Sequence, residues 1–370
     1  MNKKGSVKFD NPDQHVFYQT LKRNVQQYFT DKGISTHANA AMVTKTFIMI
    51  AAYLIPFAVI LFAQPVFWVT MLLWVLMGIA FAGIGMSVMH DANHGAYSTS
   101  PAVNKWIGFS VNLAGCVVFN WKLQHNVLHH TYTNIEGLDE DIDSKAGMRF
   151  TDQAPLKRSH KLQFIYIFGH YSIMTLYWVT VKDFRQLIRY RRTGVNAASA
   201  AEYRSQIFRL VAIKTLYFFA FLVMPTLLFS ISFWQVLIGF LIMHVTGSLI
   251  LSLTFQLAHT LEGTDHPVPD AEGKIRNIWA VHQLHTTMNF SRHNKILSWY
   301  VGGLNFQVEH HLFPKICHIH YPKIAPIVKK TAEEFNIPYK ESPTFWAALG
   351  SHLRYLYILG RVPKLDDIMD

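Results

Sequence analysis

Three clusters of histidine are the residues of this sequence best suited to chemistry. They are His90-Asp91-Ala92-Asn93-His94, His125-Asn126-Val127-Leu128-His129-His130 and Gln307-Val308-Glu309-His310-His311. On an α-helix, residues at i and i+4 lie on the same face. His90 with His94, and His125 with His129, can therefore each direct two imidazoles into one site. Each pair predicts a position where a metal ion is bound.

The doubled histidines and one later residue enlarge the predicted site. A neighbour at i+1 is turned by roughly 100° around a helix, so His130 can face a second metal position. His259 follows a long apolar stretch, as His90 does, and we expect both at the same membrane face. The candidate ligands are therefore His90, His94, His125, His129, His130, His259, His310 and His311.

Eight imidazoles predict a reactive site with two metals. Imidazole is a borderline ligand that suits iron, copper, zinc and nickel, so ligand type alone does not choose the metal. A structural zinc site closes with four ligands, whereas eight leave room for two metals that keep open positions. At iron, an open position predicts chemistry with dioxygen.

Other histidines fit plainer roles. A single histidine near a helix end is usually solvated or caps the helix, and only the joint pattern of three clusters favours metal binding. His244 lies inside an apolar stretch, about 22 Å from His259 at 1.5 Å per helical residue, and we expect it to serve in packing. His282 and His285 lack a doubled histidine after them. We expect them at the surface or in support of the ligands.

The elements that position these histidines are predicted to be membrane helices. The composition, 51% hydrophobic and 15% charged, excludes an ordinary soluble domain. Charge-free stretches long enough to cross a bilayer form two hairpins, at residues 47–63, 66–89, 215–230 and 234–257. The predicted fold is therefore all-α, an integral membrane protein with four spans and a cytoplasmic helical cap that holds the dimetal site.

Charge sets the predicted orientation and segments. The net charge is +11, and basic residues cluster in 1–45, in 182–214 and near the C-terminus, which the positive-inside rule places in the cytoplasm. The stretch 164–181 is long enough to span. If it crossed the membrane by itself, however, it would put the histidine clusters on opposite sides of the bilayer. We therefore expect it to lie in the membrane interface. The predicted segments are a cytoplasmic arm (1–45), the hairpins with the first two clusters (46–260) and a cap with the third (261–370).

The three clusters, in this order around two hairpins, resemble the histidine boxes of membrane fatty acid desaturases. Gln307 stands where many desaturases have histidine, and Leu312-Phe313-Pro314 follows the box. This form is similar to front-end desaturases, which insert a double bond between an existing one and the carboxyl group. Those enzymes often carry a fused cytochrome b-type domain with a His-Pro-Gly-Gly element. The arm is too short for that domain and lacks the element, so we expect an external electron donor.

The resemblance implies a cofactor set and partners. It implies two non-haem iron ions held by the eight histidines, with O2 as co-substrate. It implies electrons from a ferredoxin or cytochrome-type donor with its reductase, and a substrate that is an acyl-CoA or a phospholipid acyl chain. The expected setting is a lipid bilayer, in a bacterial inner membrane with the site facing the cytoplasm. No nucleic-acid partner is expected.

Further residues, two glutamines and several carboxylates, are expected around the irons. Gln307 either binds metal directly, acts through a water, or only donates and accepts hydrogen bonds. Gln256 is expected to hold a water. Asp91 and Glu309, together with Asp139 or Asp141, are expected to accept the second imidazole N–H and so fix the ligand tautomers. A solvated acidic loop is an equally good interpretation of Asp139 and Asp141.

Two alternatives remain open at the level of sequence. A hydroxylase or ketolase would use the same kind of site but insert oxygen. A histidine-rich metal transporter belongs to a different class, and it would place its ligands near the bilayer midplane at broken helices. The clusters here lie at helix ends and in polar segments, which favours the oxidase.

Overall fold

The computed structural model describes residues 7–143 and 147–363, and almost all of their regular structure is helical. The chain divides into two compact units, each assembled from separate segments. Unit 1 comprises Met1–His37, Gln124–Ile167 and Thr254–Asp370, and unit 2 comprises Ala38–Leu123 and Phe168–Leu253. The helices α8 (Gln163–Tyr177) and α12 (Phe233–His259) run through both units.

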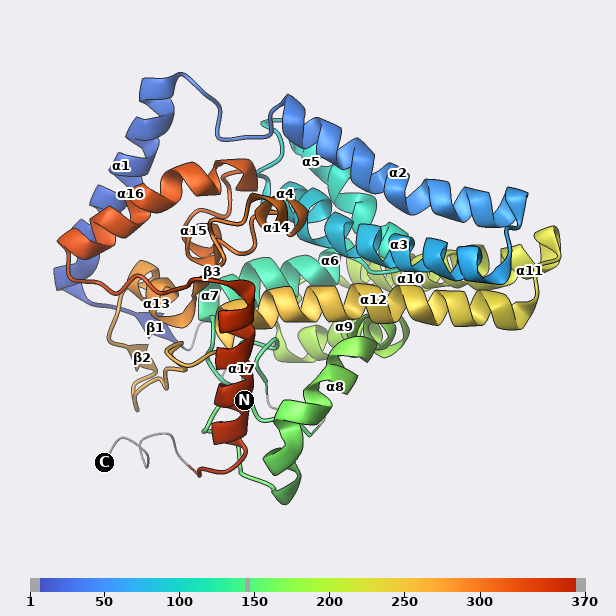
Figure 1. Ribbon diagram of the computed structural model, residues 1–370. Helices are drawn as coiled ribbons and strands as arrows, with labels where there is room; N and C mark the ends of the chain where they lie inside the picture. Colours follow the sequence, from blue (N-terminus) through green and yellow to red (C-terminus); the bar gives the residue numbers. More distant parts are fainter. Residues whose placement is uncertain (1–6, 144–146, 364–370) are drawn as a thin grey trace. The chain divides into compact units, whose positions relative to one another are not determined.

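Unit 2 contains the long apolar helices. Helices α2 (Ala40–Ala63) and α3 (Phe67–Gly83) form an antiparallel hairpin (Figure 1). The α2 helix begins where the Asn39 side chain accepts a hydrogen bond from the N–H of Met42, and it ends at Gln64, which has a φ of 43°. The other helices of this unit are α4 (Met89–His94), α5 (Pro101–Gly108), α6 (Val118–Trp121), α9 (Asp183–Thr193), α10 (Ala200–Phe218) and α11 (Met224–Phe229).

Small residues allow α3 and α12 to approach closely. A Cβ added at Gly239 would overlap the indole ring of Trp74, and one added at Gly247 would overlap the ring of Phe81. A Cβ at Gly78 would lie 2.6 Å from the carbonyl oxygen of Met243. Close backbone approach through glycine is how helices associate in lipid, where burial of apolar surface gives no driving force.

Two buried polar networks tie the helices of unit 2 together. His244 contacts the Thr175 hydroxyl at 2.8 Å through Nδ1 and the Tyr217 hydroxyl at 2.8 Å through Nε2. This agrees with the packing role that the sequence predicts for it. Nearby in the chain, the Lys214 ammonium donates to Asp183 at 2.6 Å, and both side chains are buried.

Unit 1 carries the shorter helices. In α1 (His15–Lys32), Phe17, Leu21, Val25 and Phe29 recur every four residues and pack against α16 (Tyr321–Glu334), which lies beside α1 (Figure 1). The remaining helices of this unit are α7 (His130–Tyr132), α13 (Trp279–Thr286), α14 (Lys295–Tyr300), α15 (Gln307–Leu312) and α17 (Phe345–Leu359).

Strands and tighter or wider helical turns make up the rest. Parallel pairs join β1 (Lys8–Phe9) to β2 (Lys274–Ile275) and β3 (Asn289–Phe290) to β4 (Glu341–Ser342). The 3₁₀ segments are η1 (Pro12–Gln14), η3 (Phe109–Ala114), η5 (Arg158–Leu162) and η8 (His318–His320). The π-helical segments are η2 (Ile84–Val88), η4 (Lys122–His129), η6 (Trp178–Lys182) and η7 (Phe219–Val223).

Within the described residues, five helices are long and apolar enough to cross a bilayer. They are Ala40–Ala63, Phe67–His94, Arg158–Thr193, Ala200–Phe229 and Phe233–His259. Four of them cover the spans that the sequence predicts, to within one residue at an end. The fifth, Arg158–Thr193, includes the stretch expected in the interface and has the lowest mean hydropathy of the five, 1.3. An α-helical membrane protein is therefore supported, and the count of four spans stays a prediction.

Candidate active site

The second histidine cluster lies on a π-helix, where the sequence predicts a regular α-helix. His125 and His129 belong to η4, and His130 begins α7. A π-helix aligns residues at i and i+5. Accordingly, the Nε2 atoms of His125 and His130 are 3.3 Å apart, while the rings of His125 and His129 stack with centroids 5.3 Å apart. The wider turn therefore brings His130 to His125 in addition to the predicted contact between His125 and His129.

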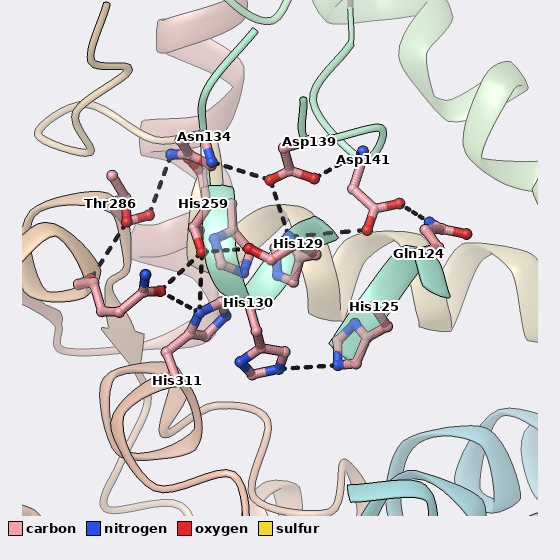
Figure 2. Close-up of polar contacts among 12 residues, drawn as sticks. Gln124, His125, His129, His130, Asn134, Asp139, Asp141, His259, Thr286 and His311 are labelled. Atoms are coloured by element: carbon pink, nitrogen blue, oxygen red, sulfur yellow. Dashed lines mark hydrogen bonds and ion pairs between the residues drawn. The ribbon is translucent and has the colours of Figure 1, made fainter. Parts of the chain in front are cut away.

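Unit 1 brings five predicted ligands into two groups that share one member, and a sixth lies beside them. The first group is His129, His259 and His311, and the second is His130, His310 and His311. In each group, one ring nitrogen of every member lies within 4.8 Å of the others, and all five side chains are buried. The sixth ligand, His125, stacks on His310 with ring centroids 5.8 Å apart. Figure 2 shows the labelled imidazoles lying next to one another.

His129 is oriented by a buried carboxylate, as the sequence predicts. Its Nδ1 lies 2.9 Å from Oδ2 of Asp139, which also accepts the N–H of Asn134 at 3.0 Å (Figure 2). Burial alone would raise the pKa of Asp139, but the charge of His129 and these hydrogen bonds hold it below its usual range. The ionised Asp139 therefore fixes the proton on Nδ1 of His129 and directs Nε2 toward the other imidazoles.

His311 is oriented by residues that the sequence does not single out. Its Nδ1 donates to Oε1 of Gln283 at 2.8 Å, and the Thr133 hydroxyl lies 2.8 Å from the same oxygen. An amide oxygen only accepts, so the proton belongs on Nδ1 of His311 and the Nε2 lone pair is available to a metal. Gln283, on α13, is fully buried. It links the second histidine cluster to the third.

Asn134 holds His259 through its backbone and not through its imidazole. Its Nδ2 lies within hydrogen-bonding distance of the carbonyl oxygens of His259 (2.9 Å), Asp265 (3.1 Å) and Thr286 (3.2 Å). Asn134 has a φ of 59°, a left-handed conformation that asparagine tolerates better than most residues. The turn after the second cluster therefore holds the end of α12 in place.

Glu309 binds differently from the prediction. Its carboxylate accepts from the Tyr339 hydroxyl at 2.7 Å and from Nδ2 of Asn289 at 2.8 Å, instead of from an imidazole. Burial raises the pKa of Glu309 to about 7. Glu309 is thus an anchor for α15, whereas the neighbouring His310 contacts the Tyr321 hydroxyl at 3.3 Å through Nδ1.

The first histidine cluster belongs to unit 2. His90 and His94 lie on α4, directly after the π-helical segment η2, and their ring centroids are 4.7 Å apart. Both rings meet Trp121 edge-on at 5.7 Å. Oδ1 of Asp91 is 3.9 Å from Nδ1 of His90, too long for a hydrogen bond. The i,i+4 pair that the sequence predicts is therefore present.

The two predicted glutamines are both buried. Nε2 of Gln256 donates to the carbonyl of Asp141 at 3.3 Å, and its Oε1 accepts from the Thr260 hydroxyl at 2.7 Å. Gln256 therefore steadies the residues around His259 through protein contacts. Oε1 of Gln307 has no hydrogen-bond partner among the described residues. A buried amide oxygen without a partner suits a water or a metal.

His282 and His285 lie outside the two imidazole groups. His282 is buried, and its ring lies 4.8 Å from that of Phe9. His285 pairs with Asp265 at 2.7 Å. Neither belongs to a metal-binding group within the described part of the chain.

The donor set fits the metals that the sequence predicts. Nε2 of His129 and Nε2 of His259 are buried, and neither has a hydrogen-bond partner within the described residues. Buried polar atoms almost always have a hydrogen-bond partner. Ring nitrogens that lack one and point at further imidazoles therefore suit a bound metal ion. Neutral imidazoles held by N–H acceptors on their far side are the usual ligands of iron and other transition metals.

A family model described as fatty acid desaturase matches residues 66–343, which include all three histidine clusters. The chain belongs to the fatty acid desaturase family. The desaturase is 37% identical to an sn-1 linoleoyl-lipid 6-desaturase of Synechocystis, over 93% of this chain and 96% of that protein. It is 35% identical to the sn-1 linoleoyl-lipid 6-desaturase of Arthrospira platensis, over 95% of each chain.

A third relative is less similar and is longer than this chain. The desaturase is 33% identical to an acyl-lipid (8-3)-desaturase of Physcomitrium patens, over 97% of this chain and 74% of the relative. Family membership makes the desaturase an oxygen-dependent oxidoreductase of lipid metabolism and removes the metal-transporter alternative. The family implies a diiron centre, which the imidazole groups fit.

Proposed function

We propose that this desaturase introduces a cis double bond on the carboxyl side of an existing one, in an acyl chain carried by a lipid. The Gln-x-x-His-His form at residues 307–311 and the names of its relatives support this front-end, acyl-lipid activity. The observation that carries the chemistry is the pair of buried imidazole groups that share His311.

We propose that all eight predicted histidines are iron ligands. Six of them lie in the groups just described or stack on them. His90 and His94 are assigned by the match of their cluster to the first histidine box and by their adjacent rings on α4. Gln307 is the ninth candidate, because its amide oxygen is buried without a partner among the described residues.

The spacing of His129 and His259 supports four membrane crossings. Their ring centroids are 4.8 Å apart, so the chain crosses the bilayer an even number of times between them. Three candidate helices lie in that interval, and one of them must stay on the site's face. Arg158–Thr193 has the lowest hydropathy of the three and carries the basic residues Arg185, Arg189, Arg191 and Arg192. We therefore place it in the interface and the site on the cytoplasmic face, in a bacterial inner membrane.

The residues of the chain orient the ligands and exclude water. An unactivated methylene of an acyl chain has no acidic proton, so acid–base groups alone cannot remove its hydrogens. Iron with dioxygen supplies the oxidant when bound. Two hydrogens leave the acyl chain, and O2 becomes two waters with two protons and two electrons from an external donor. Asp139 and Gln283 hold the tautomers of His129 and His311, and burial of all six imidazoles of unit 1 keeps bulk water away.

Fatty acid analysis of cells that express the protein tests this proposal. The cells receive a ferredoxin with its reductase and are fed mono- and diunsaturated acids, and their lipid classes are separated before mass spectrometry. New double bonds on the carboxyl side, appearing first in phospholipid or glycolipid, are expected. Hydroxy acids without new double bonds would establish the hydroxylase alternative instead. New unsaturation that appears first in acyl-CoA would contradict the lipid carrier.

Single histidine variants connect the activity to the site. His129→Ala and His310→Ala are expected to abolish desaturation while the protein still inserts in the membrane. His285→Ala, which removes a histidine outside the imidazole groups, is the matched control and is expected to stay active. Activity retained in either of the first two variants would refute the ligand assignment.

A further inference from the structure

The C-terminal helix α17 is attached to the ends of two apolar helices. At its middle, Nδ1 of His352 donates to the carbonyl of Thr260 at 2.6 Å, and the N–H of Glu262 donates to the Ser351 hydroxyl at 3.2 Å. Thr260 and Glu262 directly follow the last residue of α12. This part of α17 therefore lies where the apolar helix α12 ends.

The C-terminal end of α17 is attached to the beginning of the helix Arg158–Thr193. Nε2 of Gln163 donates to the carbonyl of Leu356 at 2.8 Å, and the rings of Phe164 and Tyr357 meet edge-on at 5.3 Å. A Cβ at Gly360 would overlap the carbonyl oxygen of His160, so the two backbones touch. α17 therefore lies at the level of the membrane face where α12 ends, and the helix Arg158–Thr193, which we place in the interface, begins at the same level.

One face of α17 is buried and the opposite face is aromatic and cationic. Ala348, His352, Tyr355, Leu356 and Leu359 form the buried face. The exposed stripe consists of Trp346, Arg354 and Tyr357, and the half-buried Gly350 and Arg361 continue it at three- and four-residue spacing, with Arg361 just past the end of α17. Side chains of the stripe are exposed to extents that a soluble surface rarely shows for aromatics, 75% for Trp346 and 45% for Tyr357.

The apolar surface continues onto α14. Ile296 is 82% exposed and Trp299 is 46% exposed. Leu297 of α14 and Phe345 of α17 pack against the same buried cluster, which includes Leu257 at the end of α12. Both short helices therefore present large apolar side chains next to the end of one membrane-crossing candidate.

We propose that α17 is an interfacial helix whose exposed stripe lies in the headgroup region of an anionic bilayer. Trp346 and Tyr357 are amphipathic rings of the kind that gather at membrane–water boundaries. Arg354 is exposed and pairs with Glu262 at 3.0 Å. Arg361, whose guanidinium lies 3.4 Å from the centre of the Tyr357 ring, supplies positive charge for lipid phosphates. With 15 residues, α17 is too short to span a bilayer, which favours a position along its surface.

This proposal depends on insertion of α12 in the membrane and not on desaturase chemistry. Its test uses the full-length protein in nanodiscs of phosphatidylcholine and phosphatidylglycerol. Cys116 and Cys317 are both buried, so a single introduced cysteine can be labelled with an environment-sensitive fluorophore. Trp346→Cys and Tyr357→Cys are the test positions. Lys330→Cys, on α16, is the aqueous control, and Leu216→Cys, on α10, is the control within a span.

Quenching by lipids with a spin label at different depths decides the outcome. At both test positions, the label near the headgroups is expected to quench more strongly than the label near the chain ends, and Leu216→Cys should show the reverse order. Lys330→Cys should respond only to an aqueous quencher. Aqueous quenching alone at either test position would overturn the proposal. Protection from both lipid and aqueous quenchers would also overturn it, because another protein surface would then cover the helix.

Discussion

The site residues that could not be predicted from the sequence are those that orient the metal ligands and are not ligands themselves. Histidine spacing predicts the two imidazole groups because ligand chemistry leaves a pattern in the chain. Gln283 and Thr133 carry no such pattern, since an amide or a hydroxyl serves many purposes. A weak signal is present nonetheless. Thr133 and Asn134 follow the second cluster directly, and both reach toward ligand residues in the structure.

Gln283→Leu is expected to weaken iron binding by about 10- to 100-fold, the usual cost of losing a partner that orients a ligand. Leucine fills a similar volume but does not accept the Nδ1 proton of His311. The rate at which a chelator removes iron from the purified protein measures the effect without relying on turnover. Gln283→Glu keeps an acceptor oxygen and is expected to hold iron about as well as the natural residue.

Gln163→Leu is the matched control for general damage. Gln163 is also a fully buried glutamine of unit 1, but its hydrogen bonds go to the backbone of Arg149 and Leu356. This variant is expected to unfold more easily while releasing iron at the natural rate. If Gln283→Leu releases iron no faster than Gln163→Leu, Gln283 has only a structural role.

At the scale of elements, the location of the long helices can be predicted from the sequence, but whether a given turn is α-helical or π-helical cannot. Charge-free stretches predict α2, α3, α10 and α12, because a bilayer requires long apolar helices. The i,i+4 spacing of the second cluster predicts an α-helix, yet η4 is π-helical and pairs His125 with His130. A π-turn inserts one residue per turn without a change in composition, so nothing in the apolar pattern reveals it.

Gly239→Ala is expected to lower the free energy of unfolding by about 1–3 kcal/mol, because its new methyl group overlaps the Trp74 ring between α3 and α12. Thermal unfolding in detergent, followed by circular dichroism, gives the change. Gly169→Ala is the control, since Gly169 is helical and no atom lies within 4 Å of its added Cβ. Equal stability of the two variants would refute the close approach of α3 and α12.

The attachment of α17 predicts a loss of stability in acid. Burial lowers the pKa of His352 to about 4 from its ordinary value of 6.5. The unfolded chain therefore takes up a proton below pH 6.5 that the folded chain refuses until about pH 4. Stability falls as the pH drops through this window, by at most about 3 kcal/mol for this residue.

His352→Gln removes this titration. Its melting temperature is expected to fall less between pH 6.5 and pH 4 than that of the natural protein. Some dependence remains, because burial also lowers the pKa of His266 to about 4. An unchanged pH dependence in the variant would show that His352 does not contribute to acid unfolding.

At the scale of the whole molecule, the sequence predicts continuous segments and the structure has interleaved ones. Residues 1–37 of the predicted arm and all of the predicted cap belong to unit 1, and so do residues 124–167, which the hydropathy pattern assigns to the segment between the hairpins. Hydropathy reports only whether a stretch prefers lipid. It carries no information on which polar stretches pack together, and that packing decides the units. The histidines of the second and third clusters meet because unit 1 is assembled in this way.

The last prediction concerns membrane topology, that is, on which side of the bilayer each segment lies. If Arg158–Thr193 does not cross, residue 192 lies on the same face as residue 330, and residue 66 lies on the opposite face. Single cysteines at Arg192, Lys330 and Val66, all exposed, can be labelled with a membrane-impermeant maleimide in sealed right-side-out and inside-out vesicles. Arg192→Cys and Lys330→Cys should react only in inside-out vesicles, and Val66→Cys only in right-side-out vesicles. Reaction of Arg192→Cys together with Val66→Cys would make Arg158–Thr193 a true span. Because His129 and His259 are in contact, one of the two later helices would then have to enter and leave by the same face.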